Sequence, residues 1–271
     1  MFEIFTYSFF INAMVTALLA SITCGIVGSY IVTKRIVFIS GGITHASFGG
    51  IGLGYFLGIN PIITASIFGV LSAVGIKAVA AKTEVREDST IGIFWALGMA
   101  VGIIFIYMTP GYAPDLMTYL FGNILTISQA DMIYLSILTV GVVIYFFIMF
   151  KEILFISFDE NFARTQNVKV DLINYTLIAI VALSIVVNIR IVGIILVISM
   201  LTIPQATAGM LTKNFKQMIF LSIVFGFVSS IGGLIISYDL NIPSGASIIF
   251  SSVILFIIVK TIKAVSSLKK N

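Results

Sequence analysis

The sequence has very few of the side chains that soluble enzymes use for chemistry. Its 271 residues include one histidine and one cysteine, and only 10% are Asp, Glu, Lys or Arg, whereas soluble proteins contain about 25% charged residues. A single cysteine excludes an internal disulfide. No GxxxxGK[ST] motif is present, so the chain does not hydrolyse ATP through a P-loop, and no HExxH motif supports a zinc protease. We therefore expect a protein that is not itself an enzyme.

Apolar residues dominate instead, at 59% of the chain, and the mean hydropathy is +1.17. Runs of about 20 apolar residues, each long enough to cross a hydrocarbon layer roughly 30 Å thick, recur from end to end. They predict an all-α fold, a polytopic transmembrane helical bundle in which residues 1–271 form one domain. Eight to nine spans are expected, because the segments 43–58 and 239–250 are short and interrupted by glycine or proline. The predicted helices are 5–32, 43–58, 60–80, 89–109, 129–150, 171–188, 191–211, 217–238 and 245–263.

The charged residues between these helices alternate in sign. Only Arg190 falls on the side that carries Glu3, Asp115 and Asp239. Because basic residues accumulate in cytoplasmic loops, the N-terminus is expected outside and the C-terminus inside a bacterial inner membrane. This topology explains the basic residues without a nucleic-acid partner. The residues on the expected cytoplasmic side are Lys34, Arg35, Lys77, Lys82, Arg86, Lys151, Arg164, Lys169, Lys213, Lys216, Lys260, Lys263, Lys269 and Lys270.

The only histidine, His45, lies in the glycine-rich stretch SGGITHASFGGIG, between two apolar runs. Gly49 and Gly52 follow it at i+4 and i+7, on the same helical face. One interpretation is close helix packing through the glycines, with an incidental histidine. The other is a functional site, because an ionisable group at membrane depth is costly, and neutral imidazole is a good ligand for zinc and similar metals.

A polar segment, FDENFARTQNV at residues 158–168, predicts a short surface helix on the cytoplasmic side. Asp159 is a plausible N-cap, and Asn167 stands where a helix commonly ends in a left-handed residue. Phe158, Phe162 and Ala163 share one face. An ordinary solvated loop is the alternative interpretation.

Five short motifs, in order along nearly the whole chain, resemble the membrane permease of bacterial metal ABC importers, which take up zinc, manganese or iron. They are Arg35 with the THASFGG stretch, the acidic start Glu87, Asp88, Ile91 and Gly92, the pair Asp159 and Ala163, the run Val192–Ala208 that contains Pro204, and Pro243-Ser244-Gly245.

The resemblance implies a permease that works as a homodimer. Two cytoplasmic ATPase subunits would hydrolyse ATP, and an extracytoplasmic metal-binding protein would deliver the cargo. In such a permease Asp159, Ala163, Arg164 and Asn167 would belong to the coupling helix that contacts the ATPase. Because this helix lies outside the spans, we expect Ala163→Arg to leave the fold intact.

The resemblance also implies metal ligands, at His45 and Asp239, and helix packing or a pathway at Gly41, Gly49, Gly52 and Pro204. The family usually has an aspartate four residues before the histidine, where this chain has Gly41, and another at the position of Asn241. An imidazole without a neighbouring carboxylate suits zinc better than manganese, so zinc is the expected cargo and manganese or iron the alternatives. No resident cofactor is expected.

Two other functions explain part of the same pattern. A gradient-driven secondary carrier or channel also uses a polar group and broken helices at the midplane, although it does not account for the patterned segment 158–168. A permease for siderophores or cobalamin has a related architecture in a usually longer chain.

Overall fold

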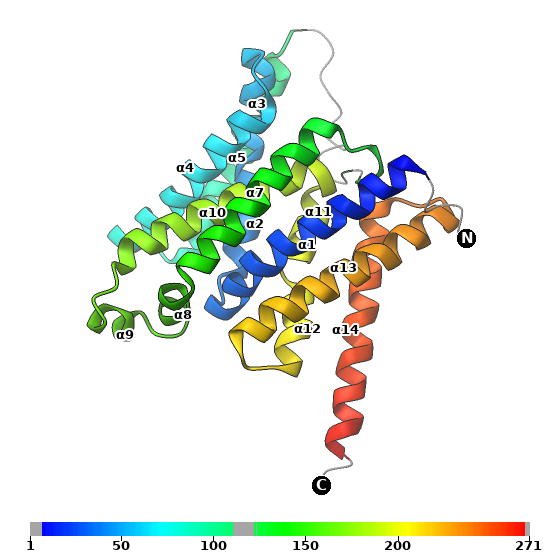
Figure 1. Cartoon of the computed structure of the whole chain (residues 1–271). Coiled ribbons are helices and arrows are strands. Elements are labelled where there is room, and N and C mark those ends of the chain that lie inside the picture. The colour runs from blue at the N-terminus through cyan, green and yellow to red at the C-terminus, as the bar shows by residue number, and fades with distance from the viewer. Residues whose placement is uncertain (1–6, 111–121, 123, 269–271) are drawn as a thin grey trace.

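The computed structural model describes residues 7–110, 122 and 124–268, and these residues form a bundle of helices (Figure 1). The charged positions Glu3, Asp115, Lys269 and Lys270 lie outside the described residues. In chain order the helices are α1 (Ser8–Lys34), α2 (Val37–Ala46), α3 (Phe48–Leu57), α4 (Pro61–Lys82), α5 (Glu87–Met108), the 3₁₀ turn η2 (Ile124–Thr126), α7 (Gln129–Ile148), α8 (Phe150–Phe158), α9 (Glu160–Thr165), α10 (Val170–Val192), α11 (Ile194–Met200), α12 (Ile203–Leu211), α13 (Phe215–Leu240) and α14 (Ser244–Leu268).

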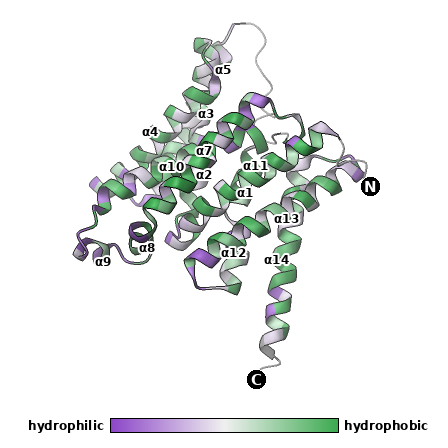
Figure 2. Cartoon of the chain, in the orientation of Figure 1, coloured by the Kyte–Doolittle hydropathy of each residue, from purple (hydrophilic) through white to green (hydrophobic). Residues whose placement is uncertain are grey.

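Eight helical segments within the described residues are long and apolar enough to cross a membrane. They correspond to eight of the nine predicted helices. The ninth, predicted at 43–58, is a pair of ten-residue helices, α2 and α3, that meet at Ser47 and begin at Val37, six residues earlier than expected. The all-α polytopic bundle is therefore confirmed, and apolar side chains cover the spans while polar ones gather at α8, α9 and the helix ends (Figure 2).

Two of the predicted spans contain local breaks. At Ser47 the backbone tightens, because the amide of Gly50 donates to the Ser47 carbonyl at 3.0 Å, three residues back. Gly193 separates α10 from α11 with φ 84° and ψ 162°, a conformation that only glycine adopts readily. The segment 194–211 is then interrupted again between α11 and α12, just before Pro204, which stands in the first turn of α12.

Helix α1 lies at the centre of the bundle, between α7 on one side and α13 on the other (Figure 1). Small residues such as Ala13, Ala17, Ala20 and Gly25 line its buried face, so neighbouring backbones approach closely, as is usual in membrane interfaces. Helix α14, in contrast, lies at the edge of the bundle. Its first half packs on α13, and its second half extends away from the bundle with exposed apolar side chains.

The basic residues gather at one end of the bundle. There Lys34 at the end of α1 donates to Glu160 of α9 at 2.5 Å, and Lys263 of α14 donates to a carbonyl at the end of α12. At the opposite end Arg190 lies 3.7 Å from Asp131. This end-to-end separation of charge agrees with the alternation in the sequence. We refer to the first as the basic end.

Candidate functional site

Glycines form a close seam between the α2–α3 pair and α5. A Cβ atom on Gly98 of α5 would lie 2.4 Å from the Cα of Ala46, and one on Gly52 of α3 would lie 2.3 Å from the Gly102 carbonyl oxygen. A Cβ atom on Gly49 would lie 3.0 Å from the carbonyl oxygen of Gly98. The predicted packing glycines Gly49 and Gly52 therefore both face neighbouring helices. Gly49 lies against the Phe68 ring and the Gly98 carbonyl, and Gly52 lies against the backbone of Gly102.

Gly41 differs from these seam glycines. A Cβ at Gly41 would meet one ring carbon of Trp95 at 3.8 Å, an ordinary contact distance. The position where the family usually carries an aspartate is therefore spacious enough to accept one in this chain.

His45 stacks against Trp95 of α5, the only tryptophan in the chain. The ring centroids lie 4.0 Å apart and the planes differ by 6°. His45 is roughly midway along the segment 37–57, so the pair lies near the middle of the bundle. The Nδ1 atom of His45 is buried and has no hydrogen-bond partner among the described residues. A nitrogen lone pair or N–H without a partner at this depth is costly unless something else binds it.

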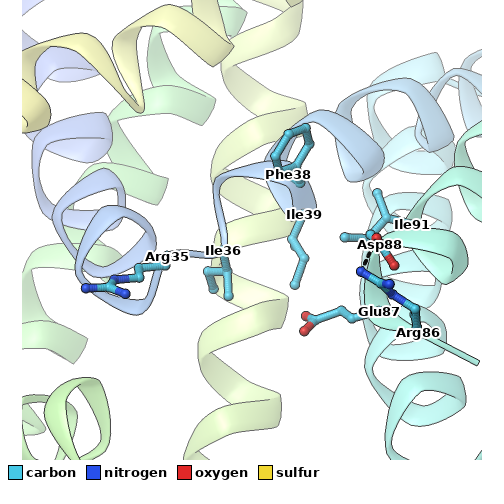
Figure 3. A pocket seen from close by; sticks show the side chains of 8 residues that line it. All are labelled: Arg35, Ile36, Phe38, Ile39, Arg86, Glu87, Asp88 and Ile91. Atoms are coloured by element: carbon cyan, nitrogen blue, oxygen red, sulfur yellow. Dashed lines mark hydrogen bonds and ion pairs between the residues drawn. The ribbon is translucent and has the colours of Figure 1, made fainter. Parts of the chain in front are cut away.

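A cleft of about 420 Å³ opens at the basic end below this pair. It lies between the start of α2, which contributes Phe38 and Ile39, and the start of α5 (Figure 3). Glu87 points from α5 into the cleft, whereas Asp88 is paired with Arg86 at 3.2 Å. Helix α5 thus carries the Glu87 carboxylate at the basic end and, near mid-depth, Trp95, which stacks on His45 of α2.

The second predicted metal residue lies elsewhere. Asp239 is exposed in the last turn of α13, at the end of the bundle opposite the basic end, whereas His45 is near mid-depth. Within the described part of the chain, no group of three or more His, Cys, Asp or Glu side chains could hold a metal ion. Among the described residues, His45 and Asp239 are therefore not brought together into one site.

The segment 158–168 folds as the sequence predicts. The Asp159 carboxylate accepts hydrogen bonds from the backbone amides of Asn161 and Phe162 at 2.9 and 3.0 Å, which caps α9. Asn167 has φ 59°, and the amide of Val168 donates to the Ala163 carbonyl at 3.2 Å. This is a Schellman motif that satisfies the last carbonyl groups of the helix.

Two ion pairs fix α9 to the bundle. The carboxylate of Glu160 is bonded to Lys34, and the guanidinium of Arg164 makes a bidentate contact with Asp171 of α10, at 2.7 and 3.1 Å. Burial tends to raise the pKa of Glu160, but the hydrogen bond and charge of Lys34 outweigh it and hold that pKa below its usual value. The hydrogen bond and charge of Asp171 raise the pKa of Arg164 above its usual value.

Ala163 corrects one expectation. Its side chain is fully buried, with an exposed fraction of 0%, so Ala163→Arg would break the packing of α9 on the bundle rather than leave the fold intact. Phe162 packs edge-on against Phe155 with ring centroids 5.4 Å apart. Phe158 is 65% exposed. The outer surface of this segment is therefore formed by Phe158, the exposed part of Phe162 and the polar residues of α9.

Pro204, predicted to be a packing or pathway residue, is buried in the first turn of α12. The next residue, Gln205, is fully buried and donates to the carbonyls of Cys24 at 2.8 Å and Met200 at 3.0 Å. Its side chain lies where a Cβ on Gly28 of α1 would collide at 2.5 Å. Gln205 thus ties the broken span to the central helix.

Comparison with known proteins decides the family. The family model described as the ABC 3 transport family matches residues 6–263. The chain belongs to this family. It is 43% identical to the membrane protein slr2045 of Synechocystis sp., over 95% of this chain and 92% of that protein. It is 36% identical to the manganese transport system membrane protein MntC of Listeria monocytogenes, over 93% of this chain and 90% of that one.

A solved structure shares the fold. PsaBC from Streptococcus pneumoniae, determined in complex with Fab, superimposes with a TM-score of 0.84 and 34% identity, covering 93% of this ABC 3 family chain and 91% of that chain. The two residues that sequence reasoning missed in this family member are Trp95 and Gln205. The uniqueness of Trp95 in the chain was an available signal, whereas the contacts of Gln205 come from residues far apart in the sequence.

Proposed function

We propose that this chain is the membrane permease of an ATP-driven importer for divalent transition-metal ions. The observation that carries the proposal is the His45–Trp95 pair, an imidazole with an unpartnered nitrogen near mid-depth, in a chain that belongs to the ABC 3 transport family over nearly its whole length. The basic end is cytoplasmic in this proposal, which leaves the N-terminus outside and the C-terminus inside. Membership of a family named for ABC transport favours this function over a gradient-driven carrier.

The cargo we infer first is manganese, because the relative MntC is named for manganese transport. Zinc is the second candidate, and a specific observation favours it: His45 has no carboxylate on its own helix face, since position 41 is glycine. Imidazole alone suits zinc, whereas manganese prefers oxygen ligands.

The ligand role of His45 is tested by metal uptake into vesicles that contain the complete importer. His45→Gln keeps approximate size and hydrogen bonding but offers a much poorer ligand, so uptake should fall severely while expression and assembly remain normal. Thr44→Ser is the matched control, because the Thr44 hydroxyl donates to the Ser40 carbonyl and serine retains that bond. Normal uptake by a well-folded His45→Gln protein contradicts the proposal.

The cargo is tested by competition between manganese and zinc for uptake by the unaltered importer. Gly41→Asp places a carboxylate one helical turn from His45, in a position with room for it. It should shift preference toward manganese, and the uncharged Gly41→Asn should not. If added manganese does not reduce the uptake of zinc, the cargo is zinc rather than manganese.

ATP hydrolysis belongs to a separate subunit in this proposal, and α9 with the end of α8 forms the contact with it. The supporting features are the rigid caps of α9, its ion pairs to α1 and α10, and the exposed Phe158. Phe158→Ala should abolish the stimulation of ATP hydrolysis by the metal-loaded binding protein. Phe220→Ala is the matched control, since Phe220 of α13 is also 65% exposed. Equal stimulation in both variants contradicts the assignment of this contact.

A homodimer completes the proposal. Helix α5 exposes Tyr107 at 93%, and the second half of α14 exposes the apolar side chains Ile257, Ile262 and Val265. Pairing two copies on these surfaces would bring two His45 side chains toward one passage. Native mass measurement of the purified permease should give the mass of two chains, and a monomer that transports at the normal rate contradicts this arrangement.

A further inference from the structure

A second cavity, of about 720 Å³, lies at the basic end on a different side of the bundle from the His45–Trp95 pair. Its walls come from the junction of α7 and α8 on one side and the start of α13 on the other, and Ile26 of α1 contributes to its floor. Helices α7 and α13 both pack on α1 (Figure 1), and the cavity is the groove between them. Its volume is in the range of small-molecule sites.

The inner part of this groove is apolar. Phe146 is buried at its base, while Phe147 and Ile148 are exposed along its edge and Ile219 faces them from α13. These side chains belong to predicted membrane spans, so the groove opens toward the region that lipid chains occupy. An acyl chain matches this surface better than a soluble, polar ligand does.

The mouth of the groove is charged, and all three charged residues that line it are on the first turns of two helices. They are Lys151 and Glu152 of α8 and Lys216 of α13. The ammonium of Lys216 lies 5.0 Å above the Phe150 ring, which keeps it at the mouth. The Asn214 side chain already accepts from the backbone amides at the start of α13, so an anion here would bind the two lysine ammonium groups.

Glu152 makes the mouth unusual. Its Oε2 atom is buried and has no hydrogen-bond partner among the described residues. A buried carboxylate oxygen without a hydrogen-bond donor is costly. A positively charged donor from a bound ligand would remove this cost. The groove thus combines two cations with one anion that needs a donor, above an apolar interior.

We propose that this groove binds one phospholipid whose headgroup carries both a phosphate and a primary ammonium group, as in phosphatidylethanolamine. The phosphate contacts Lys151 and Lys216, the ammonium donates to Glu152, and one acyl chain lies along Phe147 and Ile219. Basic pockets between spans at the cytoplasmic side are suited to lipid headgroups, and the carboxylate adds selectivity for the ammonium. The site does not depend on which metal is transported.

The test is native mass spectrometry of the full-length chain purified in detergent and equilibrated with an equimolar mixture of phosphatidylethanolamine, phosphatidylglycerol and phosphatidylcholine. The unaltered chain should retain phosphatidylethanolamine preferentially. Lys151→Gln and Lys216→Gln should each weaken retention by about fivefold, and Lys213→Gln, which lies outside the groove at the same end, should not. Glu152→Gln should keep phosphatidylglycerol binding and lose the preference for the primary ammonium.

Several outcomes overturn the proposal. Equal retention of phosphatidylethanolamine and phosphatidylcholine would show that the N–H donors of the lipid ammonium are not recognised. Preferential retention of phosphatidylglycerol would show that Glu152 does not bind the headgroup. Unchanged retention in the Lys151→Gln/Lys216→Gln double variant would place the lipid elsewhere. Loss of the dimer in that variant, with lipid retention unchanged, would mean that a second copy of the chain covers the groove. A rise in melting temperature on adding phosphatidylethanolamine, absent in the double variant, supports the site independently.

Discussion

Replacing Gly98 with alanine tests whether the glycine seam positions the candidate metal site. The new Cβ would lie 2.4 Å from both the Cα and the carbonyl oxygen of Ala46, the residue directly after His45. Non-bonded carbon atoms in contact lie about 3.5–4.0 Å apart, so α2 and α5 would have to separate by about 1 Å. That movement displaces Trp95 from the His45 ring, because the two residues are on opposite sides of the seam.

The cost follows from two opposing effects. Overpacking of a close contact costs about 1–3 kcal/mol, and alanine regains up to about 1 kcal/mol over glycine within a helix. With that full gain subtracted, the net destabilisation is up to about 2 kcal/mol, which corresponds to a fall of up to several degrees in melting temperature. Gly92→Ala is the matched control in the same helix, since a Cβ there meets nothing within 4 Å. It should melt at or slightly above the temperature of the unaltered protein.

Fluorescence provides the assay for the geometry. Trp95 is the only tryptophan, so its emission reports on the stack with His45 without interference from other tryptophans. Gly98→Ala should change the emission and reduce metal uptake, whereas Gly92→Ala should change neither. Unaltered melting, emission and uptake in Gly98→Ala would refute the argument that backbone contact sets the position of this pair.

Three further predictions concern local structure. Gly193→Ala should destabilise the protein by about 1–3 kcal/mol in thermal unfolding, because φ 84° and ψ 162° exclude a side chain, whereas Gly209→Ala, in open space, should be silent or stabilising. The folded-state pKa of Glu160 is below its usual value of 4.5, so its pair with Lys34 stabilises the fold above that pH and is lost as pH falls further. Thermal melts should thus show a difference of about 0.5 kcal/mol or less between Glu160→Gln and the unaltered protein at neutral pH, shrinking on acidification; a constant difference contradicts the pairing. Asn167→Ala should lower the melting temperature slightly and Asn167→Gly should not, since position 167 has φ 59°.

Helix positions were predictable from the sequence because membrane spans are defined by a local property, a run of apolar residues of fixed length. The caps of α9 were predictable for the same reason, since Asp159 and Asn167 act on amides and carbonyls a few residues away. The start of the second span at Val37 was not predicted, because the charged Arg35 two residues earlier indicates a longer loop. In the structure Arg35 caps the end of α1 with φ 60°, and α2 begins two residues later.

Contacts between distant segments were not predictable. Nothing local to Trp95 indicates that it stacks on His45, and the burial of Ala163 depends on how α9 docks against the bundle. Gly41, Gly49 and Gly52 look alike in the sequence, yet a Cβ on Gly41 would meet only one Trp95 carbon at 3.8 Å, whereas Gly49 and Gly52 lie close to the backbone of α5.

The backbone contact between α3 and α5 also restricts how the protein can move. Where Gly52 meets Gly102 and Gly98 meets Ala46, backbone lies directly against backbone, and the side chains of Phe48 and Ile91 pack beside these contacts. We therefore expect helices α2, α3 and α5 to move as one unit that keeps the stack of His45 on Trp95. In that case a change of state would take place at the outer face of this unit, where Trp95 is 39% exposed, rather than by separation of the helices.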